Sequence, residues 1–259
     1  MGSSVGLATE LELAATEGAI LDRGAYLVVR TVDPTYYLGN LLVLAAPPWP
    51  GEVARWVQRF TDEFADNPAI RHVAFRWDGT GTPAGAHLEL TAAGFAIEDH
   101  WVMAADRITA ARTAYPIRAL APDDMDAVAE LGFSIADNHS DGYRRFLKRR
   151  AAWKADLVAS RRARFWGAFD GDQLVGSLGL GAIDRAGPER ARFQDVQTAS
   201  THRGRGIAST LLATAASAAE AARYVIVVEP GSPASGVYMR AGFTVIERLV
   251  SAVNVPAAR

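Results

Sequence analysis

The stretch HRGRGIAS, residues 202–209, follows the strand-like run ARFQDVQTAS (191–200) and precedes the alanine-rich run TLLATAASAAEAAR (210–223). A strand that leads through a glycine turn into a helix forms an anion site, because the first helical amides lack acceptors and the helix dipole favours negative charge there. Gly204 and Gly206 let the backbone approach a ligand closely. The stretch therefore predicts a phosphate-binding turn, to which Arg203 and Arg205 either add charge or remain solvated.

Two nucleotide-binding interpretations compete for this turn. The letters GRGIAS are close to a dinucleotide fingerprint, and Glu229 lies 25 residues after Gly204, near the place of a ribose-binding acid. Such a domain needs further strand–helix–strand units after its first turn, whereas only about 30 residues follow Glu229 and four strands precede the motif. A P-loop is excluded because the sequence has no GK[ST].

The composition of the 259-residue chain is that of a folded globular protein, with 49% hydrophobic residues and a net charge of −2. It has no cysteine, which excludes disulfides, thiolate metal sites and a cysteine nucleophile. No apolar run reaches the length of about 20 residues that a membrane helix needs, and the N-terminus lacks the pattern of a signal peptide. We therefore expect a cytoplasmic protein without a membrane partner.

The chain has two halves with a similar ending. IRHVAFRWD (70–78) and ARYVIVVEP (222–230) are strand-like, and each leads through an AGF triplet into an extended run. His72 and Tyr224 are 152 residues apart, and Gly94 and Gly242 are 148 apart, so order and spacing agree. We interpret this as a duplication and predict two domains, residues 1–112 and 113–259. The first is acidic, with 8 basic and 14 acidic side chains, and the second is basic, with 19 and 15.

The second domain is predicted to be a mixed α/β fold. Its order is a strand (116–122), a helix (123–132), a loop (134–142), a basic helix (143–160), a hairpin turning at Asp170-Gly171, the strand before the glycine turn, and a final strand, helix and strand. In the last helix Ser232 is the predicted cap, Pro233 suits the first turn and Gly242 ends it.

With these motifs the sequence resembles the GNAT superfamily of acyl-CoA-dependent N-acyltransferases. The family signature [Q/R]-x-x-G-x-[G/A] is matched by Arg203, Gly206 and Ala208, and the closing pattern A-x-x-x-Y-x-x-x-G-F by Ala234, Tyr238, Gly242 and Phe243. The resemblance covers about residues 113–255. It implies a tandem protein of two GNAT-like domains, a complete C-terminal copy and a degenerate N-terminal copy. In the N-terminal copy APPWPGEVARWV (46–57) stands in place of the turn and Leu90 in place of the tyrosine.

The resemblance implies acetyl-CoA as co-substrate, with its pyrophosphate wrapped by the glycine turn. The backbone of the preceding strand would pair with the pantetheine arm, and the N–H of Thr198 would reach the thioester carbonyl. Gly231 stands where family members often carry an asparagine, so a serine of the last helix is expected to replace that contact. The residues expected to bind the cofactor are Val196, Gln197, Thr198, Arg203, Gly204, Arg205, Gly206, Ile207, Ala208, Ser209, Ser232 and Ser235.

For catalysis, the resemblance points to Tyr238 as the general acid, because a phenol with a pKa of about 10 is protonated at neutral pH. Many family members carry a glutamate base where Gln194 stands. Since an amide cannot accept the proton, the role passes to Asp195 or to an ordered water. Strand alternation predicts that Gln194 and Asp195 lie on opposite faces, so only one of them faces the cleft.

Acceptor specificity in this fold usually comes from the first two helices and their connection, so Asn138 and His139 are predicted to bind the acceptor. The basic helix either forms a solvated face or attracts an anionic acceptor; without interleaved aromatics it does not favour nucleic acid. No histidine has metal-site spacing, so no metal is expected. The sequence predicts acetyl transfer to a primary amine of a small molecule or peptide by direct attack. The alternatives are a non-catalytic acyl-CoA-binding or regulatory protein and a dinucleotide-dependent enzyme.

Overall fold

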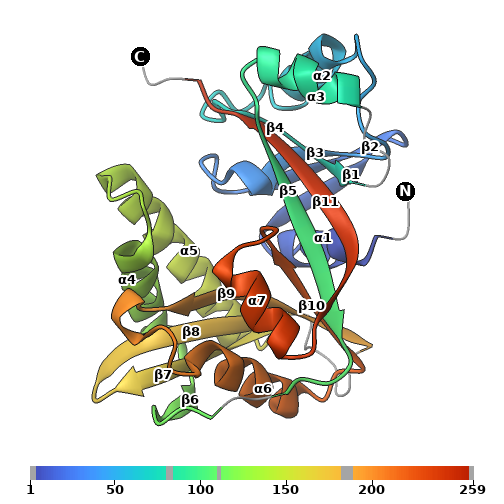
Figure 1. Ribbon diagram of the computed structural model, residues 1–259. Coiled ribbons are helices and arrows are strands. Elements are labelled where there is room, and N and C mark those ends of the chain that lie inside the picture. Colours follow the sequence, from blue (N-terminus) through green and yellow to red (C-terminus); the bar gives the residue numbers. More distant parts are fainter. Residues whose placement is uncertain (1–3, 80–83, 110–111, 182–188, 257–259) are drawn as a thin grey trace. The chain divides into compact units, whose positions relative to one another are not determined.

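The computed structural model describes residues 4–79, 84–109, 112–181 and 189–256. The chain forms two compact units (Figure 1). The first unit comprises residues 1–102 together with 245–259, and the second comprises 103–244. These bounds differ from the predicted linear division at 112/113, because the last strand of the chain belongs to the first unit.

In the part of the chain that the structure describes, the first unit consists of a mixed sheet and three helices. Its strands follow the order β1-β2-β3-β4-β11-β5, in which only β3 and β4 are recorded as parallel. The strands are β1 (Gly18–Asp22), β2 (Tyr26–Thr31), β3 (Asn40–Leu44), β4 (Val73–Asp78), β5 (Ala96–Ala105) and β11 (Thr244–Asn254). The helices are α1 (Val5–Ala14), α2 (Val53–Glu63) and α3 (Ala84–Ala92), with a short 3₁₀ turn at Tyr37–Gly39.

Strand β11 is fixed in the first unit by its neighbours. It pairs antiparallel with β4 over six residues, from Leu249 opposite Asp78 to Asn254 opposite Val73, and β5 lies on its other side (Figure 1). Glu247 of β11 also accepts hydrogen bonds from the amide of Val5 (2.9 Å) and the hydroxyl of Ser4 (2.7 Å) at the start of α1. These contacts explain why the strand predicted after the last helix does not stay with that helix.

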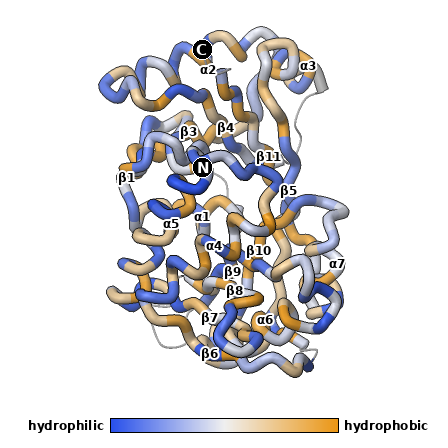
Figure 2. The backbone as a smooth tube through the Cα atoms, turned by 90° about the vertical axis from the view of Figure 1, so that its left-hand side faces the viewer, coloured by the Kyte–Doolittle hydropathy of each residue, from blue (hydrophilic) through white to orange (hydrophobic). Residues whose placement is uncertain are grey.

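The core of the first unit lies between the sheet and α2. Strand β3 is apolar from Leu41 to Leu44 (Figure 2), and all five of its residues, including Asn40, are buried. Phe60 of α2 packs edge-on against the fully buried Phe75 of β4, and Trp56 of α2 packs edge-on against Tyr26 of β2. A strand buried on both faces reads as a continuous apolar run, which the residues after Asn40 show.

The second unit contains the elements predicted around the glycine turn. Its strands are β6 (Ile117–Ala119), β7 (Ala163–Asp170), β8 (Gln173–Gly181), β9 (Arg190–Thr198) and β10 (Arg223–Val228), together with the last residues of β5. Its helices are α4 (Met125–Ile135), α5 (Asp141–Ala159), α6 (Ile207–Ala219) and α7 (Pro233–Arg240), with 3₁₀ turns at Pro122–Asp124 and Ser200–His202. The predicted mixed α/β class is confirmed.

Several predicted turn and cap residues take the predicted roles. Gly171 has φ +57° in the β7–β8 hairpin. The hydroxyl of Ser232 accepts the amide of Ser235 at the start of α7, Pro233 is its first residue, and Gly242 follows its end with φ +105°. These turns and caps can be predicted from the sequence because each depends on the conformational preference of one residue.

Among the described residues, no helix is both long and apolar enough to cross a membrane. In the same ranges, no group of three or more histidine, aspartate or glutamate side chains could hold a metal ion.

Candidate active site

Strands β9 and β10 pair only at their beginnings. They run parallel, with Arg190 opposite Arg223 and Arg192 opposite Val225, and no further partners are recorded for the described part of β9 on this side. On its other side β9 stays paired with β8 as far as Thr198. The backbone edge of Val196 to Thr198 is therefore free to bind an extended ligand as an added strand would.

A bulge interrupts β9 immediately before this free edge. Gln197 pairs with Ser177 of β8, and Gln194 pairs with Gly179. Between these two pairs β9 advances by three residues while β8 advances by only two. Asp195 lies within the bulge and has φ +51°, a left-handed conformation that is uncommon for residues other than glycine. Because of the extra residue, Gln194 and Gln197 both face the side of the sheet that carries Ser177.

The glycine turn opens directly onto α6. Gly204 and Gly206 have φ +76° and +75°, and Gly206 is the residue that precedes the helix. Within the described residues, the amides of Gly204 to Ser209 have no recorded acceptor, and the hydroxyls of Ser209 and Thr210 donate back to the carbonyl of Gly206 (3.1 and 2.9 Å). The turn thus presents a set of unsatisfied N–H donors at the positive end of a 13-residue helix.

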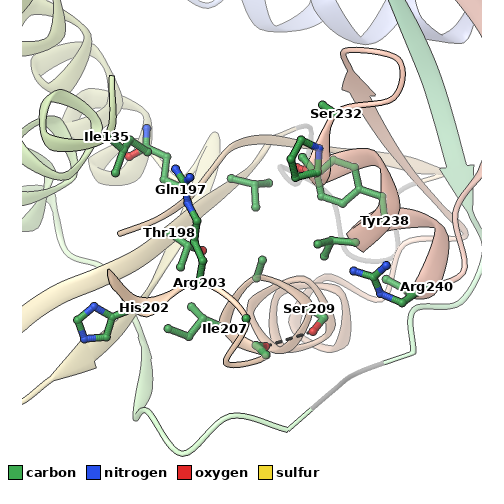
Figure 3. A pocket seen from close by; sticks show the side chains of 18 of the residues that line it. Ile135, Gln197, Thr198, His202, Arg203, Ile207, Ser209, Ser232, Tyr238 and Arg240 are labelled. Carbon is green, nitrogen blue, oxygen red and sulfur yellow. Dashed lines mark hydrogen bonds between the residues drawn. The ribbon is translucent and has the colours of Figure 1, made fainter. Parts of the chain in front are cut away.

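A cavity of about 820 Å³ joins the free edge of β9 to this turn and to α7. In Figure 3, Gln197, Thr198 and Arg203 lie on one side of it and Ser232, Tyr238 and Arg240 on the other, with Ile207 and Ser209 below. It brings together most of the residues predicted to bind the cofactor: Val196, Gln197, Thr198, Arg203, Gly204, Gly206, Ile207, Ala208, Ser209 and Ser232.

The cavity wall also contains residues that the sequence analysis did not select. These are Thr109, Ile135, His202, Pro233, Ala234, Val237, Arg240 and Ala241. Ala234, Val237 and Ala241 lie three or four positions from Tyr238 or from one another, so they share its face of α7. The helical spacing around Tyr238 could have identified them. Ile135 comes from the end of α4, a contact that no local pattern indicates.

Two arginines of the cavity wall are available to a ligand. Arg203 and Arg240 are exposed, and neither guanidinium group has a recorded hydrogen bond or ion pair with a described residue. His202, by contrast, is already engaged, with Nε2 3.1 Å from Asp170 Oδ2 and Nδ1 2.9 Å from the hydroxyl of Thr201. The guanidinium groups and the free amides of the turn make this part of the cavity suited to phosphate groups.

Tyr238 is the only titratable side chain of the cavity that is buried, among the described residues, with 5% of its surface exposed. Burial raises the pKa of its phenol above the ordinary value. No hydrogen bond of its hydroxyl to a described residue is recorded, while its ring packs against Phe243 with centroids 6.1 Å apart. The phenol is therefore held in its protonated form and has its donor free.

Two of the predicted cofactor residues lie outside the cavity wall. Arg205 is turned toward Tyr115, to whose hydroxyl it donates a hydrogen bond, and the guanidinium also lies over the Tyr115 ring. Ser235 is buried in α7, where its hydroxyl donates to the carbonyl of Ser232 (2.8 Å). Of the two serines considered for the cofactor contact, only Ser232 lines the cavity.

Asp195, the candidate general base, and Gln194, which stands where family members carry a glutamate, also lie outside the wall. The carboxylate of Asp195 forms an ion pair with Lys154 of α5, with Nζ 2.9 Å from Oδ2. Nε2 of Gln194 is buried without a hydrogen-bond partner, and so are Oε1 of Gln197 and the hydroxyl of Ser177 on the same face. None of the described residues in the wall is an aspartate or glutamate.

The predicted acceptor residues lie on the surface of the α4–α5 connection. Asn138 accepts the amide of Ser140 (3.0 Å), and His139 packs edge-on against Phe133 with centroids 5.1 Å apart. Both are exposed, and neither lines the cavity. Ile135, at the end of α4, is the residue of this region that reaches it.

Residues 128–243 match the sequence model of the acetyltransferase (GNAT) family. They form a GNAT acetyltransferase domain. The chain thus contains an acetyltransferase domain of this family, which fills most of the second unit. A search of curated proteins finds no match.

Solved structures share the architecture of the whole chain. One is a functionally unknown conserved protein from Staphylococcus epidermidis, with a TM-score of 0.75 at 13% identity over 92% of this chain and 94% of that one. A GCN5-related N-acetyltransferase from Kribbella flavida has a TM-score of 0.69 at 15% identity over 99% and 97%. A tandem GNAT protein from the clavulanic acid biosynthesis pathway has a TM-score of 0.54 at 14% identity over 93% and 83%. At these identities the likeness shows the fold alone.

Proposed function

We propose that the second unit transfers the acetyl group of acetyl-CoA to a primary amine by direct attack of the amine on the thioester. The observation that carries this proposal is the composition of the cavity wall. Unsatisfied amides lie at the start of α6, Arg203 and Arg240 lie on opposite sides of the cavity, and the free strand edge and a protonated phenol face the same space. The lack of cysteine in the chain excludes an acyl-cysteine intermediate.

The start of α6 suits the diphosphate of coenzyme A. The amides of Gly204 to Ser209 would donate to its oxygens, and the helix dipole would favour its negative charge. Arg203 and Arg240 would add charge-assisted hydrogen bonds. Because the two glycines carry no Cβ and both have positive φ, the backbone can approach the phosphates without obstruction.

The free edge of β9 suits the pantetheine arm. The amides of Val196 and Thr198 are two residues apart and point to the same edge, as alternate residues of a strand do. The arm would pair with these groups as an added strand. We assign the N–H of Thr198 to the thioester carbonyl, where a backbone donor stabilises the oxygen as negative charge develops.

In the reaction the amine nitrogen forms a bond to the carbonyl carbon, the carbon–sulfur bond breaks, and the sulfur leaves with the electron pair. Tyr238 would donate a hydrogen bond to that sulfur. The raised pKa of its phenol lies well above the value of about 8.5 typical of a thiol. The phenol therefore stabilises the thiolate by hydrogen bonding more readily than by complete proton transfer, and the thiol takes its final proton from solvent.

The attacking amine must lose a proton, and no carboxylate lines the described cavity wall to accept it. Gln194 stands near the free edge and cannot act as a base, and the carboxylate of Asp195 is held by Lys154. We propose that water in the cavity accepts this proton, or that the amine loses it to solvent before it binds. This requirement predicts rates that rise with pH as the fraction of neutral amine increases.

The acceptor is a small-molecule amine or a peptide amine, and Ile135, which lines the cavity, lies directly before the connection between α4 and α5. Asn138 and His139 are exposed on this connection and would contact an acceptor that extends beyond the cavity. A cytoplasmic location follows as a proposal from the use of acetyl-CoA.

A non-catalytic acyl-CoA-binding or regulatory protein is the second candidate, because the described cavity wall has no carboxylate base. Thiol release from acetyl-CoA over a panel of amines, with coenzyme A affinity measured by titration calorimetry, separates the two. An enzyme gives turnover that falls about 100-fold in Tyr238→Phe, with unchanged affinity. Tight binding without turnover in either protein supports the binder. Thermal stabilisation by NAD(H) and not by coenzyme A would instead indicate a dinucleotide enzyme.

A further inference from the structure

The bulge of β9 depends on a conformation that is unfavourable for its central residue. Asp195 has φ +51°, in the left-handed region that is unfavourable for residues with a Cβ, although aspartate tolerates it better than most. The two residues that follow, Val196 and Gln197, line the cavity with Thr198. Something must hold the bulge in this state if the free edge is to keep its position.

Lys154 supplies the contact that holds it. The lysine comes from α5, its side chain is 8% exposed, and its Nζ lies 2.9 Å from Asp195 Oδ2. The ammonium also lies over the ring of Phe165, with Nζ 6.0 Å from the ring centroid. Burying an ammonium without a partner carries a large free-energy cost. The buried ammonium of Lys154 therefore keeps the Asp195 carboxylate beside it, and the carboxylate in turn keeps the lysine in place.

The charges around Asp195 explain why this carboxylate stays ionised. The Asp195 side chain is 37% exposed, and its partial removal from water raises its pKa. The attraction and hydrogen bond of Lys154, with contributions from Arg150 and Arg192, lower the pKa by more. The net result is a pKa below the ordinary value for aspartate. A carboxylate with a lowered pKa is a poor base, but it remains ionised and can keep its ion pair.

We propose that Lys154 and Asp195 are positioning residues: their ion pair fixes the β9 bulge and thereby holds the amides of Val196 to Thr198 in the register that receives the thioester. This inference rests on the proposed function for its effect on catalysis. It assigns Asp195 a role other than that of general base, and it assigns a role to a lysine that the sequence analysis counted only as part of a basic helix.

Substitutions of Asp195 separate positioning from base catalysis. Asparagine tolerates the left-handed conformation and still accepts a hydrogen bond from Lys154, whereas alanine does neither. For a positioning residue, Asp195→Asn retains kcat/KM for acetyl-CoA within about threefold and Asp195→Ala loses about tenfold or more. For a general base, both variants lose 100-fold or more alike, and that result would overturn the proposal.

Substitutions of Lys154 test the other partner. Lys154→Met should lower kcat/KM about tenfold, while Lys154→Arg, which keeps the charge, should restore most of it. Lys148→Met is the matched control, because Lys148 is an exposed lysine of the same helix, and it should behave as wild type. Affinity for coenzyme A, set mainly at the glycine turn, should stay within about threefold in all three. Equal activity of Lys154→Met and wild type would refute the role.

A measurement that needs no turnover distinguishes failure of this proposal from failure of the proposed function. Amide hydrogen exchange of the segment 194–198 should be faster in Lys154→Met than in wild type and Lys148→Met, while exchange in the β7–β8 hairpin is unchanged. If the wild type turns over no amine but this exchange difference is present, the ion pair fixes the bulge and the proposed function is wrong. If the segment exchanges equally in all variants, the ion pair does not fix the bulge.

Discussion

Leu90 in the first unit occupies the position that Tyr238 occupies in the second. The carbonyl of each accepts the amide of a phenylalanine five residues later, at 3.0 Å in both cases. A glycine with positive φ precedes each phenylalanine, Gly94 at +84° and Gly242 at +105°. The backbone of the two helix endings is thus the same, while the phenol is present in only one of them.

In the first unit, carboxylates of the protein accept hydrogen bonds from backbone amides in the segment that stands in place of the glycine turn. Before α2, the amide of Gly51 donates to the carboxylate of Glu89 (2.6 Å) and that of Trp49 donates to Glu52 (3.1 Å). These carboxylates occupy donors at the position where the second unit leaves them free. We therefore expect one coenzyme A per chain in titration calorimetry. Two equivalents, or one that survives disruption of the turn at Gly204, would contradict this assignment.

The glycine turn can be tested with two substitutions of equal backbone cost. Gly204 and Gly171 both have positive φ, and a Cβ added at either meets no atom within 4 Å. Alanine at each should therefore destabilise the protein by a similar amount, about 1–2 kcal/mol. Only Gly204→Ala should weaken coenzyme A binding, by about tenfold, because it distorts the amides that face the cavity.

The two melting temperatures should be compared first, to establish that the variants are matched in stability. Loss of coenzyme A affinity in Gly171→Ala to the same extent as in Gly204→Ala would mean that general destabilisation, and not the turn, governs binding.

Much of the site was predictable because it depends on local backbone chemistry. The positive φ of Gly204 and Gly206, the Ser232 cap and the Asp170-Gly171 turn each follow from the preference of one or two residues. Tyr238 lines the cavity, as predicted from the spaced pattern of Ala234, Tyr238, Gly242 and Phe243.

Other features depend on tertiary contacts that no local pattern encodes. The bulge at Asp195 could not be predicted from strand alternation: one extra residue in β9 places Gln194 and Gln197, three positions apart, on the same face of the sheet. Strand β11 reads as a strand in the sequence, but its partner β4 lies about 170 residues earlier. Lys154 is one of several cations in its helix, and only the fold shows that it is the one that meets Asp195.

Arg240 provides a test of where the phosphates bind. It lines the cavity without a recorded ion pair to a described residue, so Arg240→Ala should weaken coenzyme A binding by about threefold to tenfold, a difference that shrinks at high salt. Arg223→Ala is the control, since Arg223 is an exposed arginine of the same unit that pairs with Asp106 (2.9 Å). Pantetheine, which lacks the phosphates, should bind wild type and Arg240→Ala equally. Weaker pantetheine binding in Arg240→Ala would show that the arginine acts on the cavity's shape.

The last prediction concerns the pH range over which Tyr238 can act. A raised pKa keeps the phenol protonated up to the folded-state value, so its hydrogen bond is lost only as pH rises through that value, which lies above the ordinary one of about 10. We expect kcat to show no alkaline decline between neutral pH and pH 10. The tyrosinate absorbance of wild type minus that of Tyr238→Phe isolates this residue among the seven tyrosines. A difference titration with a midpoint at or below 10 would show that the phenol is hydrated, and a buried donor aimed at the thioester sulfur would then be ruled out.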